Sequence, residues 1–95
     1  MNINEVDCSG NTCLHLAILE RYSDMALAII ELGVNINIQG EGLNTPLHLA
    51  VSLDDYRVVR RLIVKEADKS IVNEEGNKVV DLEMTDDIRQ LVRKK

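Results

Sequence analysis

The phrase NTCLHLAI at residues 11–18 returns almost unchanged as NTPLHLAV at residues 44–51. The two phrases stand 33 residues apart, so that His48 repeats His15. When the sequence is shifted by this distance, the match extends without a gap over residues 3–35 and 36–68. An internal repeat of this length predicts stacked units, each too small to bury a core alone.

Each unit is expected to hold two short helices. Thr45 is a good N-cap, because its hydroxyl accepts a hydrogen bond from a free amide of the first turn, and Pro46 suits the first helical position. The first helix of the second unit is predicted at about 46–53, and a stripe of apolar residues at helical spacing predicts the second at about 56–65. We expect an all-α chain of five or six short helices in antiparallel pairs, without a sheet. Polar turns containing glycine and asparagine separate the units, at 37–44 and 73–77.

The composition narrows the class of protein. The chain has 95 residues, 45% of them hydrophobic, with no Phe or Trp, which predicts one domain with an aliphatic core. Its net charge of −5 argues against nucleic acid and anionic membranes as main partners, and no apolar run is long enough to span a membrane. The polar, acidic start is unlike a secretory signal, so reduced thiols and a cytoplasmic or nuclear location are expected. The spacing of Cys8, Cys13 and His15 does not match zinc signatures, so neither a metal nor a cofactor is expected.

The repeated phrase resembles the ankyrin repeat family. The resemblance rests on GNTCLHLA at 10–17, on TPLHLA at 45–50, and on VVRRLIVKEAD at 58–68, which is similar to the family's apolar second helix followed by Gly-Ala-Asp. It implies a short solenoid of paired antiparallel helices with hairpin-like loops, about two full repeats and a partial C-terminal capping repeat. We place one domain at 1–95, with repeats at about 7–39 and 40–72 and the cap at about 73–95.

In that family, the threonine closes a bond network with the histidine, and the histidine ties adjacent loops together. The resemblance therefore implies structural roles for Thr12, His15, Thr45, Pro46 and His48. Neither histidine has a nucleophile or a carboxylate at a catalytic motif spacing, so we expect no enzyme.

Several residues depart from the family pattern. Cys13 replaces the proline that starts the first helix, and we interpret it as a small buried filler. Gly40 stands where the family favours Asp, and Leu43 stands where its turn glycine falls, so the second hairpin is expected to have an altered, apolar tip. Asp81 stands where a third histidine would be. The N-terminal side of the first unit is left exposed, covered by another copy, or continued by a longer array.

Function is expected on the concave side, where the family's hairpin tips and first helices form a continuous strip. We predict a non-catalytic protein–protein interaction module, an inhibitor or adaptor, whose acids steer a partner with a basic segment. The positions that the resemblance places there are Cys8, Ser9, Asn11, Leu19, Glu20, Glu41, Leu43, Asn44, Ser52, Leu53, Glu74, Glu75 and Asn77, flanked by Val6, Gln39 and Val72.

Four alternatives stay open. Leu19 and Leu53 either anchor a partner or pack against a neighbouring loop, and the acidic loops are either a binding surface or simply solvated. The chain could also be a self-associating unit that pairs through its uncapped N-terminal repeat. A small metal- or thiol-dependent protein using the cysteines and histidines is the remaining class.

Overall fold

The computed structural model describes residues 4–93 of the chain. Within that range it contains five α-helices, two 3₁₀ turns and no strand, which confirms the all-α prediction. The elements are α1 (Cys13–Leu19), α2 (Ser23–Glu31), η1 (Glu41–Leu43), α3 (Pro46–Ser52), α4 (Tyr56–Val64), η2 (Val79–Asp81) and α5 (Asp86–Arg93).

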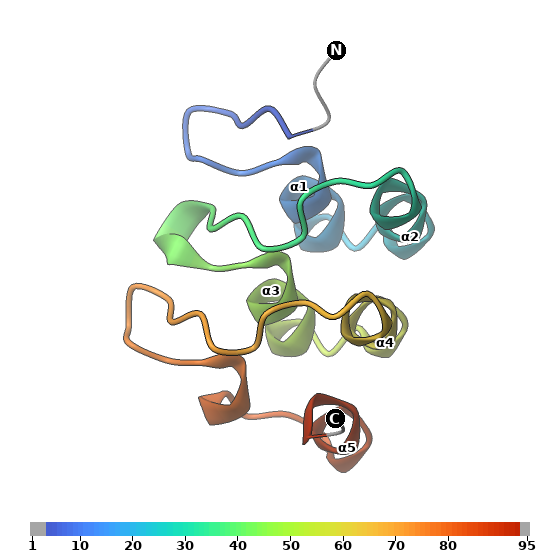
Figure 1. Ribbon diagram of the computed structural model, residues 1–95, viewed down its shortest axis with the longest axis vertical. Helices are drawn as coiled ribbons and strands as arrows, with labels where there is room; N and C mark the ends of the chain where they lie inside the picture. The colour runs from blue at the N-terminus through green and yellow to red at the C-terminus, as the bar shows by residue number, and fades with distance from the viewer. Residues whose placement is uncertain (1–3, 94–95) are drawn as a thin grey trace.

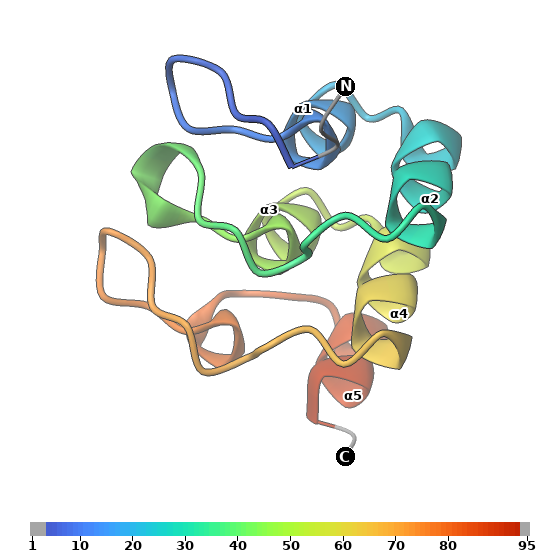
Figure 2. The same cartoon turned by 45° about the horizontal axis from the view of Figure 1, so that its top comes forward.

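The helices form a stack of helix pairs with hairpins projecting to one side (Figures 1 and 2). We call residues 7–39 unit 1, 40–72 unit 2 and 73–93 unit 3. The inner layer, next to the hairpins, contains α1, α3 and η2, while α2, α4 and α5 form the outer layer (Figure 1). Each helix contacts its partner within a unit and its counterpart in the next unit. The predicted solenoid is therefore present.

The core is aliphatic, as the composition predicts. Because each helix is only about two turns long, its apolar residues must be covered by neighbouring helices as well as by its pair. Leu14, Leu47, Val58 and Leu62 are fully buried at these contacts. The remaining core residues are Ala17, Ile18, Ala26, Ile29, Ile30, Val34, Ala50, Val51, Val59, Ala67, Val79, Ile88 and Val92.

Unit 3 closes the C-terminal end of the stack in a reduced form. Its first helix is only the single turn η2, where the Asp81 carboxylate accepts a hydrogen bond from the Lys78 backbone amide at 3.0 Å. Its second helix, α5, buries Ile88 and Val92 against α4 and turns charged residues to solvent. A terminal unit with one apolar and one polar side is what a solenoid needs as a cap.

The structure corrects one detail of the predictions and makes two others more exact. Cys13 is exposed at the start of α1, so it is not a buried filler. Leu53, for which packing and contact with a partner both stay open in the sequence analysis, is half-buried and packs on the core. The helices predicted at about 46–53 and about 56–65 are present, and each ends one residue earlier, because Leu53 and Lys65 are C-caps.

Candidate protein-binding surface

The hairpins that form the candidate surface are fixed to the helices by two equivalent histidine networks. In unit 1, the Thr12 backbone amide donates to Nδ1 of His15 at 3.1 Å, and the Thr12 hydroxyl lies 2.9 Å from the same nitrogen. Nε2 of His15 lies 3.0 Å from the carbonyl oxygen of Asn44, in the next hairpin. In unit 2, Thr45 and His48 make the same contacts, and His48 reaches the carbonyl of Asn77 at 3.0 Å.

These partners decide the protonation of the rings. Because a backbone amide can only donate, Nδ1 must accept, and Nε2 carries the proton that it donates to the carbonyl. Burial lowers the pKa of His15 below its ordinary value near 6.5, although the bond to the Asn44 carbonyl opposes the shift. The neutral imidazole therefore acts as a fixed link between two loops, not as an available base.

A second link joins the first two hairpins. Oδ1 of Asn11 accepts a hydrogen bond from the Glu41 backbone amide at 2.9 Å. Gly40 allows this approach, since a Cβ there would collide with Oδ1 of Asn11 and lie 2.9 Å from Cδ2 of His15. Gly40 stands where the family favours Asp, and the close approach of Asn11 and His15 is the steric reason for a glycine there. Asn11 is buried by the contact, so it supports the surface from behind instead of offering a side chain to a partner.

The second and third hairpins are also joined, tip to tip. The Glu74 backbone amide donates to the carbonyl of Gly42 at 2.8 Å, and the side-chain Nδ2 of Asn73 donates to Oδ1 of Asn44 at 3.1 Å. Nε2 of Gln39 donates both to the Leu43 carbonyl at 2.9 Å and to the Val72 carbonyl at 2.8 Å. The second and third tips therefore form one hydrogen-bonded edge, to which Asn11 joins the first hairpin.

The tip of the second hairpin is the 3₁₀ turn η1, which confirms that it differs from a simple turn. Gly42 and Leu43 both have left-handed backbones, with φ of 69° and 59°. A leucine in this region is uncommon, because its Cβ crowds the backbone. Leu43 is nevertheless 50% exposed on the tip, and Glu41 of the same 3₁₀ turn is also exposed.

The other predicted binding residues divide by exposure. Asn44 and Asn77 are half-buried, and their carbonyls are occupied by the histidines. Leu53 belongs to the core and Asn11 to the hairpin link, as described above. The exposed residues of the predicted set are Cys8, Ser9, Leu19, Glu20, Glu41, Leu43, Ser52, Glu74 and Glu75.

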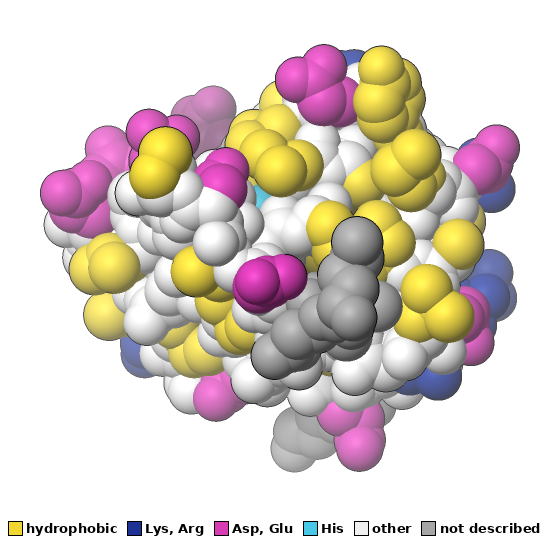
Figure 3. Space-filling model, turned by 90° about the horizontal axis from the view of Figure 1, so that it is seen from above, with side chains coloured by type: hydrophobic (Ala, Val, Ile, Leu, Met, Phe, Trp, Pro, Cys, Tyr) yellow, Lys and Arg dark blue, Asp and Glu magenta, His cyan; other side chains and the backbone are white. Residues whose placement is uncertain are grey.

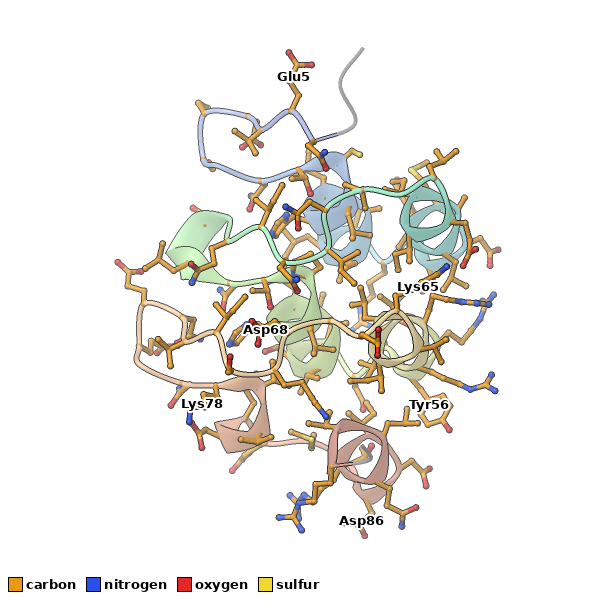
Figure 4. All side chains as sticks on the ribbon, in the orientation of Figure 1. Glu5, Tyr56, Lys65, Asp68, Lys78 and Asp86 are labelled. Carbon is orange, nitrogen blue, oxygen red and sulfur yellow. The ribbon has the colours of Figure 1, made fainter. Side chains whose placement is uncertain are left out.

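On the outer side of the stack, the basic helix α4 forms ion pairs with acidic residues of α2. Arg57 pairs with Asp24 at 2.8 Å, and Glu31 lies 3.3 Å from Arg61 and 3.7 Å from Lys65, so α4 is tied to α2. Figure 4 shows Lys65 between α4 and α2. These exposed pairs contribute little to stability but fix which helix faces which.

Two shallow hollows on this outer side are features that the sequence reasoning missed. They have volumes of about 400 and 580 Å³ and lie on either side of Arg60. Tyr56 and Leu27 line the first, while Ile63 and Leu91 line the second. The apolar stripe that predicts the second helix did not reveal these hollows, because each hollow forms between two neighbouring units and not on one helix.

The structure does not bring the candidate metal ligands of residues 4–93 together. In residues 4–93, no three His, Cys, Asp or Glu side chains come together as a metal would require. Cys8 and Cys13 are both exposed and do not form a disulfide.

A family model described as Ankyrin repeats (many copies) matches residues 29–82, and one described as Ankyrin repeat matches residues 9–41. The crystal structure of the ankyrin repeat domain of Bcl-3, a member of the IkappaB protein family, superposes with a TM-score of 0.91 and 24% identity. It covers 99% of this chain and 42% of that chain, and at this identity the likeness shows the fold alone.

Among curated proteins, human neurogenic locus notch homolog protein 1 is 42% identical over 64 residues, which are 67% of this chain and 2% of that protein. An ankyrin repeat protein of Acanthamoeba polyphaga mimivirus is 34% identical over 79 residues, 82% of this chain and 19% of its own length. An ankyrin repeat protein of fowlpox virus is 37% identical over 60 residues, 63% of this chain and 14% of its own length. The chain thus spans only a small part of each relative.

The fold is that of a solenoid of stacked helix pairs with hairpins along one edge. With family models matching more than half of its length, the chain belongs to the ankyrin repeat family. Ankyrin repeats are generally protein–protein interaction modules and generally not enzymes. None of the helices in the described part of the chain has the length and apolarity that a membrane crossing requires.

Proposed function

We propose that this chain binds a protein partner on the concave strip formed by the hairpin tips and first helices, and that it acts as an inhibitor or adaptor by covering a surface of that partner. The observation that carries the proposal is Leu43. Its side chain is half exposed on a left-handed backbone, and neither feature helps the fold. A partner that buries the remaining exposed half of this side chain would gain roughly 0.8 to 1.5 kcal/mol, half the value for a fully exposed leucine.

The partner is expected to present a basic segment next to an apolar side chain. Glu41 is exposed beside Leu43, and the Glu74 amide is bonded to Gly42, which brings the acidic third tip to the second. A Cβ on Gly42 would lie 3.9 Å from a carboxylate oxygen of Glu74, so this charge is close to the same tip. Carboxylates so placed raise the association rate of a basic partner, and salt weakens the effect.

The experiment compares two double variants in capture from an extract of the source cells. Leu43→Ala with Glu74→Lys should lose the captured partner, and added salt should weaken capture by the unchanged chain. The matched control is Arg57→Ala with Arg61→Ala, which removes two exposed charges of the outer side and should keep the partner. Loss of capture only in the arginine variant would place the partner on the outer side and overturn the proposal.

A further inference from the structure

The first of the two hollows on the outer side combines arginines with apolar side chains. We call it the outer hollow and define it by its lining residues: Leu27, Tyr56, Arg57, Arg60, Arg61 and Val64. Leu27 comes from α2 and the others come from α4, so the hollow spans the contact between units 1 and 2. Its volume of about 400 Å³ lies in the range of ligand pockets, roughly 300 to 1,000 Å³.

The composition of the hollow follows from the helical register of α4. The inward side of this helix is fully buried at Val58 and Leu62. Because residues about four positions apart lie on one side of a helix, Tyr56, Arg60 and Val64 form a stripe along the outer side. Tyr56 is 45% exposed and Val64 is 62% exposed. The stripe therefore leaves two large side chains in contact with water on either side of an arginine.

The repeat itself does not require this stripe. In unit 1, the residues that correspond to Arg60 and Val64 are Leu27 and Glu31. Both units nevertheless form the same pair of helices, so packing within a unit does not explain an arginine and a valine at these positions. The outer hollow is a property of the contact between α2 and α4, not of the repeated phrase.

Carboxylates of α2 hold two of the arginines at the ends of the hollow. Arg57 pairs with Asp24 at 2.8 Å, and Arg61 pairs with Glu31 at 3.3 Å. The two acidic residues are separated by about two helical turns, or roughly 10 Å along the axis. Leu27 lies between them on the same side of α2. The ion pairs therefore stand on either side of an apolar centre.

Arg60 lies between these ion pairs and is not engaged by either. Within residues 4–93, its exposed guanidinium takes part in no hydrogen bond or ion pair. Four cations of α4 and its C-cap face only the two carboxylates of α2, which leaves an excess of two positive charges: Arg57, Arg60, Arg61 and Lys65. This local excess stands on a chain whose net charge is −5.

The charges of the molecule are separated in the same direction. Seen from the N-terminal end, Asp and Glu side chains gather on the side of the hairpins, and most of the visible Lys and Arg side chains lie on the opposite side together with a few acids (Figure 3). An acidic ligand is therefore repelled by the hairpin tips and attracted to the outer side.

The chemistry of the hollow fits an acidic protein segment that also carries an apolar side chain. A guanidinium with free donors forms its strongest hydrogen bonds with a carboxylate. An inorganic anion would use these donors but would leave Tyr56 and Val64 uncovered. A nucleic acid or an anionic membrane needs a broad basic surface, whereas Asp24 and Glu31 stand at the two ends of this one.

We propose that the outer hollow binds an acidic segment of a partner protein. A carboxylate of the segment pairs with Arg60, and a neighbouring apolar side chain packs against Leu27, Tyr56 and Val64. The hollow lies in the outer layer, across the stack from the hairpin tips (Figure 1). The proposal does not rest on what the concave strip binds.

Fluorescence anisotropy with labelled peptides tests the binding. The probe is a short peptide with glutamates on both sides of one leucine, and its control has lysines in place of the glutamates. The glutamate peptide should bind the unchanged chain, and sodium chloride should weaken this binding. Leu43→Ala, which alters the concave strip alone, should bind the peptide equally well, so failure at the strip leaves this proposal intact. No binding up to about 1 mM peptide, or equal binding of the lysine peptide, overturns it.

A matched pair of charge substitutions locates the carboxylate. Arg60→Glu should weaken binding by about tenfold to a hundredfold, the effect of losing a hydrogen bond to a charged group. Arg89→Glu makes the same change of charge at an exposed position of α5 and should leave the affinity within about twofold, because salt screens distant charges. Equal losses in the two variants contradict the assignment to Arg60.

A second matched pair tests the apolar contact. Val64→Ser should weaken binding by about threefold to tenfold, because the apolar side chain of the peptide loses its partner. Val80→Ser changes a valine in η2 that is 50% exposed and should bind the peptide like the unchanged chain. All four substituted residues are exposed, so circular dichroism should show an unchanged fold. A loss with Arg60→Glu but not with Val64→Ser would show plain charge attraction and overturn the proposal.

Two other occupants give distinct results. The hairpin tip with Glu41 and Leu43 has the same chemistry as the probe, so a second copy would appear in sedimentation as self-association that both Arg60→Glu and Leu43→Ala abolish. An anionic membrane would appear as cosedimentation with phosphatidylserine vesicles that Arg60→Glu abolishes. Either result overturns the assignment to a segment of a partner protein.

Discussion

Units 1 and 2 contain almost the same phrase and make the same bonds between threonine and histidine, but they differ in what covers them. Their threonines have nearly equal backbone angles, φ −81° and ψ 172° at Thr12 against φ −83° and ψ 165° at Thr45. Both histidines lie 3.0 Å from a carbonyl of the following hairpin. Met25 is nevertheless half exposed where Val58 is fully buried. The repeated residues thus determine the geometry within a unit, while position in the stack determines which surfaces remain accessible.

The largest effect is expected when a histidine link is removed. His48→Ala leaves a cavity and deprives the Asn77 carbonyl of its donor, so we expect a loss of about 2 to 3 kcal/mol in unfolding free energy. His15→Ala should behave alike if the two units are equivalent. Urea denaturation measures both, with the exposed Ser52→Ala as the control. An unchanged midpoint for His48→Ala would falsify the structural role of the ring.

A smaller loss of stability is expected when Gly40 is substituted, at the position where the turns of the two units differ most. The equivalent residue of unit 1 is Asp7, whose side chain accepts bonds from the Ser9 and Asn11 amides at 2.9 and 3.0 Å. Gly40→Ala should destabilise the chain by about 1 to 2 kcal/mol, since the new methyl group collides with Asn11. In an Asn11→Ala background the additional loss should shrink, and a double-mutant cycle that shows no coupling would contradict this account.

A gain in stability is expected when Cys13, the first residue of α1, is replaced by proline, the residue that starts α3. The backbone of Thr12 already has the extended conformation that a following proline requires. Cys13→Pro should therefore raise stability by about 0.5 to 1 kcal/mol, mainly by restricting the unfolded chain. Thermal and urea unfolding would measure the gain, and Pro46→Cys should produce a loss. A destabilised Cys13→Pro variant would show that the two helix starts are not equivalent.

A still smaller change in stability is expected from a substitution just after the end of α4. Glu66 has a φ of 62° at the position where unit 1 has Gly33, with a φ of 91°. Glu66→Gly should stabilise the chain by about 0.5 kcal/mol, because the left-handed backbone no longer strains a side chain. The reverse test is Gly33→Ala, which meets no atom within 4 Å and so measures the backbone penalty alone. Stabilisation by Gly33→Ala would be inconsistent with this interpretation.

The smallest effect concerns pH. The pKa of His15 is lowered by burial, so below its ordinary value near 6.5 the unfolded chain takes up a proton that the folded chain does not. Stability should be complete above about pH 6.5 and fall as the pH decreases toward the folded pKa. Denaturant midpoints from pH 7.5 to 5.5, compared with those of His15→Gln, should show this slope only in the unchanged chain. Identical slopes would rule out His15 as its source.

Much of the fold could be predicted, because it depends on local chemistry that recurs. The helix starts at Thr12 and Thr45 follow from the capping preference, and the aliphatic core follows from the absence of Phe and Trp. The reduced unit 3 could also be anticipated, because Asp81 replaces the histidine of the phrase. The expectations about the solenoid and its altered second hairpin are confirmed.

Exposure could not be predicted in the same way, because it depends on neighbours in space. Cys13 was expected to be buried by analogy with Pro46, but no unit covers it in this structure. Leu53 corresponds to the exposed Glu20 and still packs on the core. The bond from Asn11 to the backbone of position 41 carries no sequence signature, although Gly40 hints at a close approach.

The histidine links have one further consequence, which concerns how such a chain can evolve. Nε2 of each ring meets a main-chain carbonyl, and every residue type supplies that oxygen. The join between units is therefore indifferent to the side chains at the receiving position. Exposed side chains on the hairpin tips that lie outside the links of Asn11, Gln39 and Asn73 can change without loosening the histidine join, and units can be duplicated or exchanged as modules. Recognition can diverge quickly on a scaffold that is inherited almost unchanged.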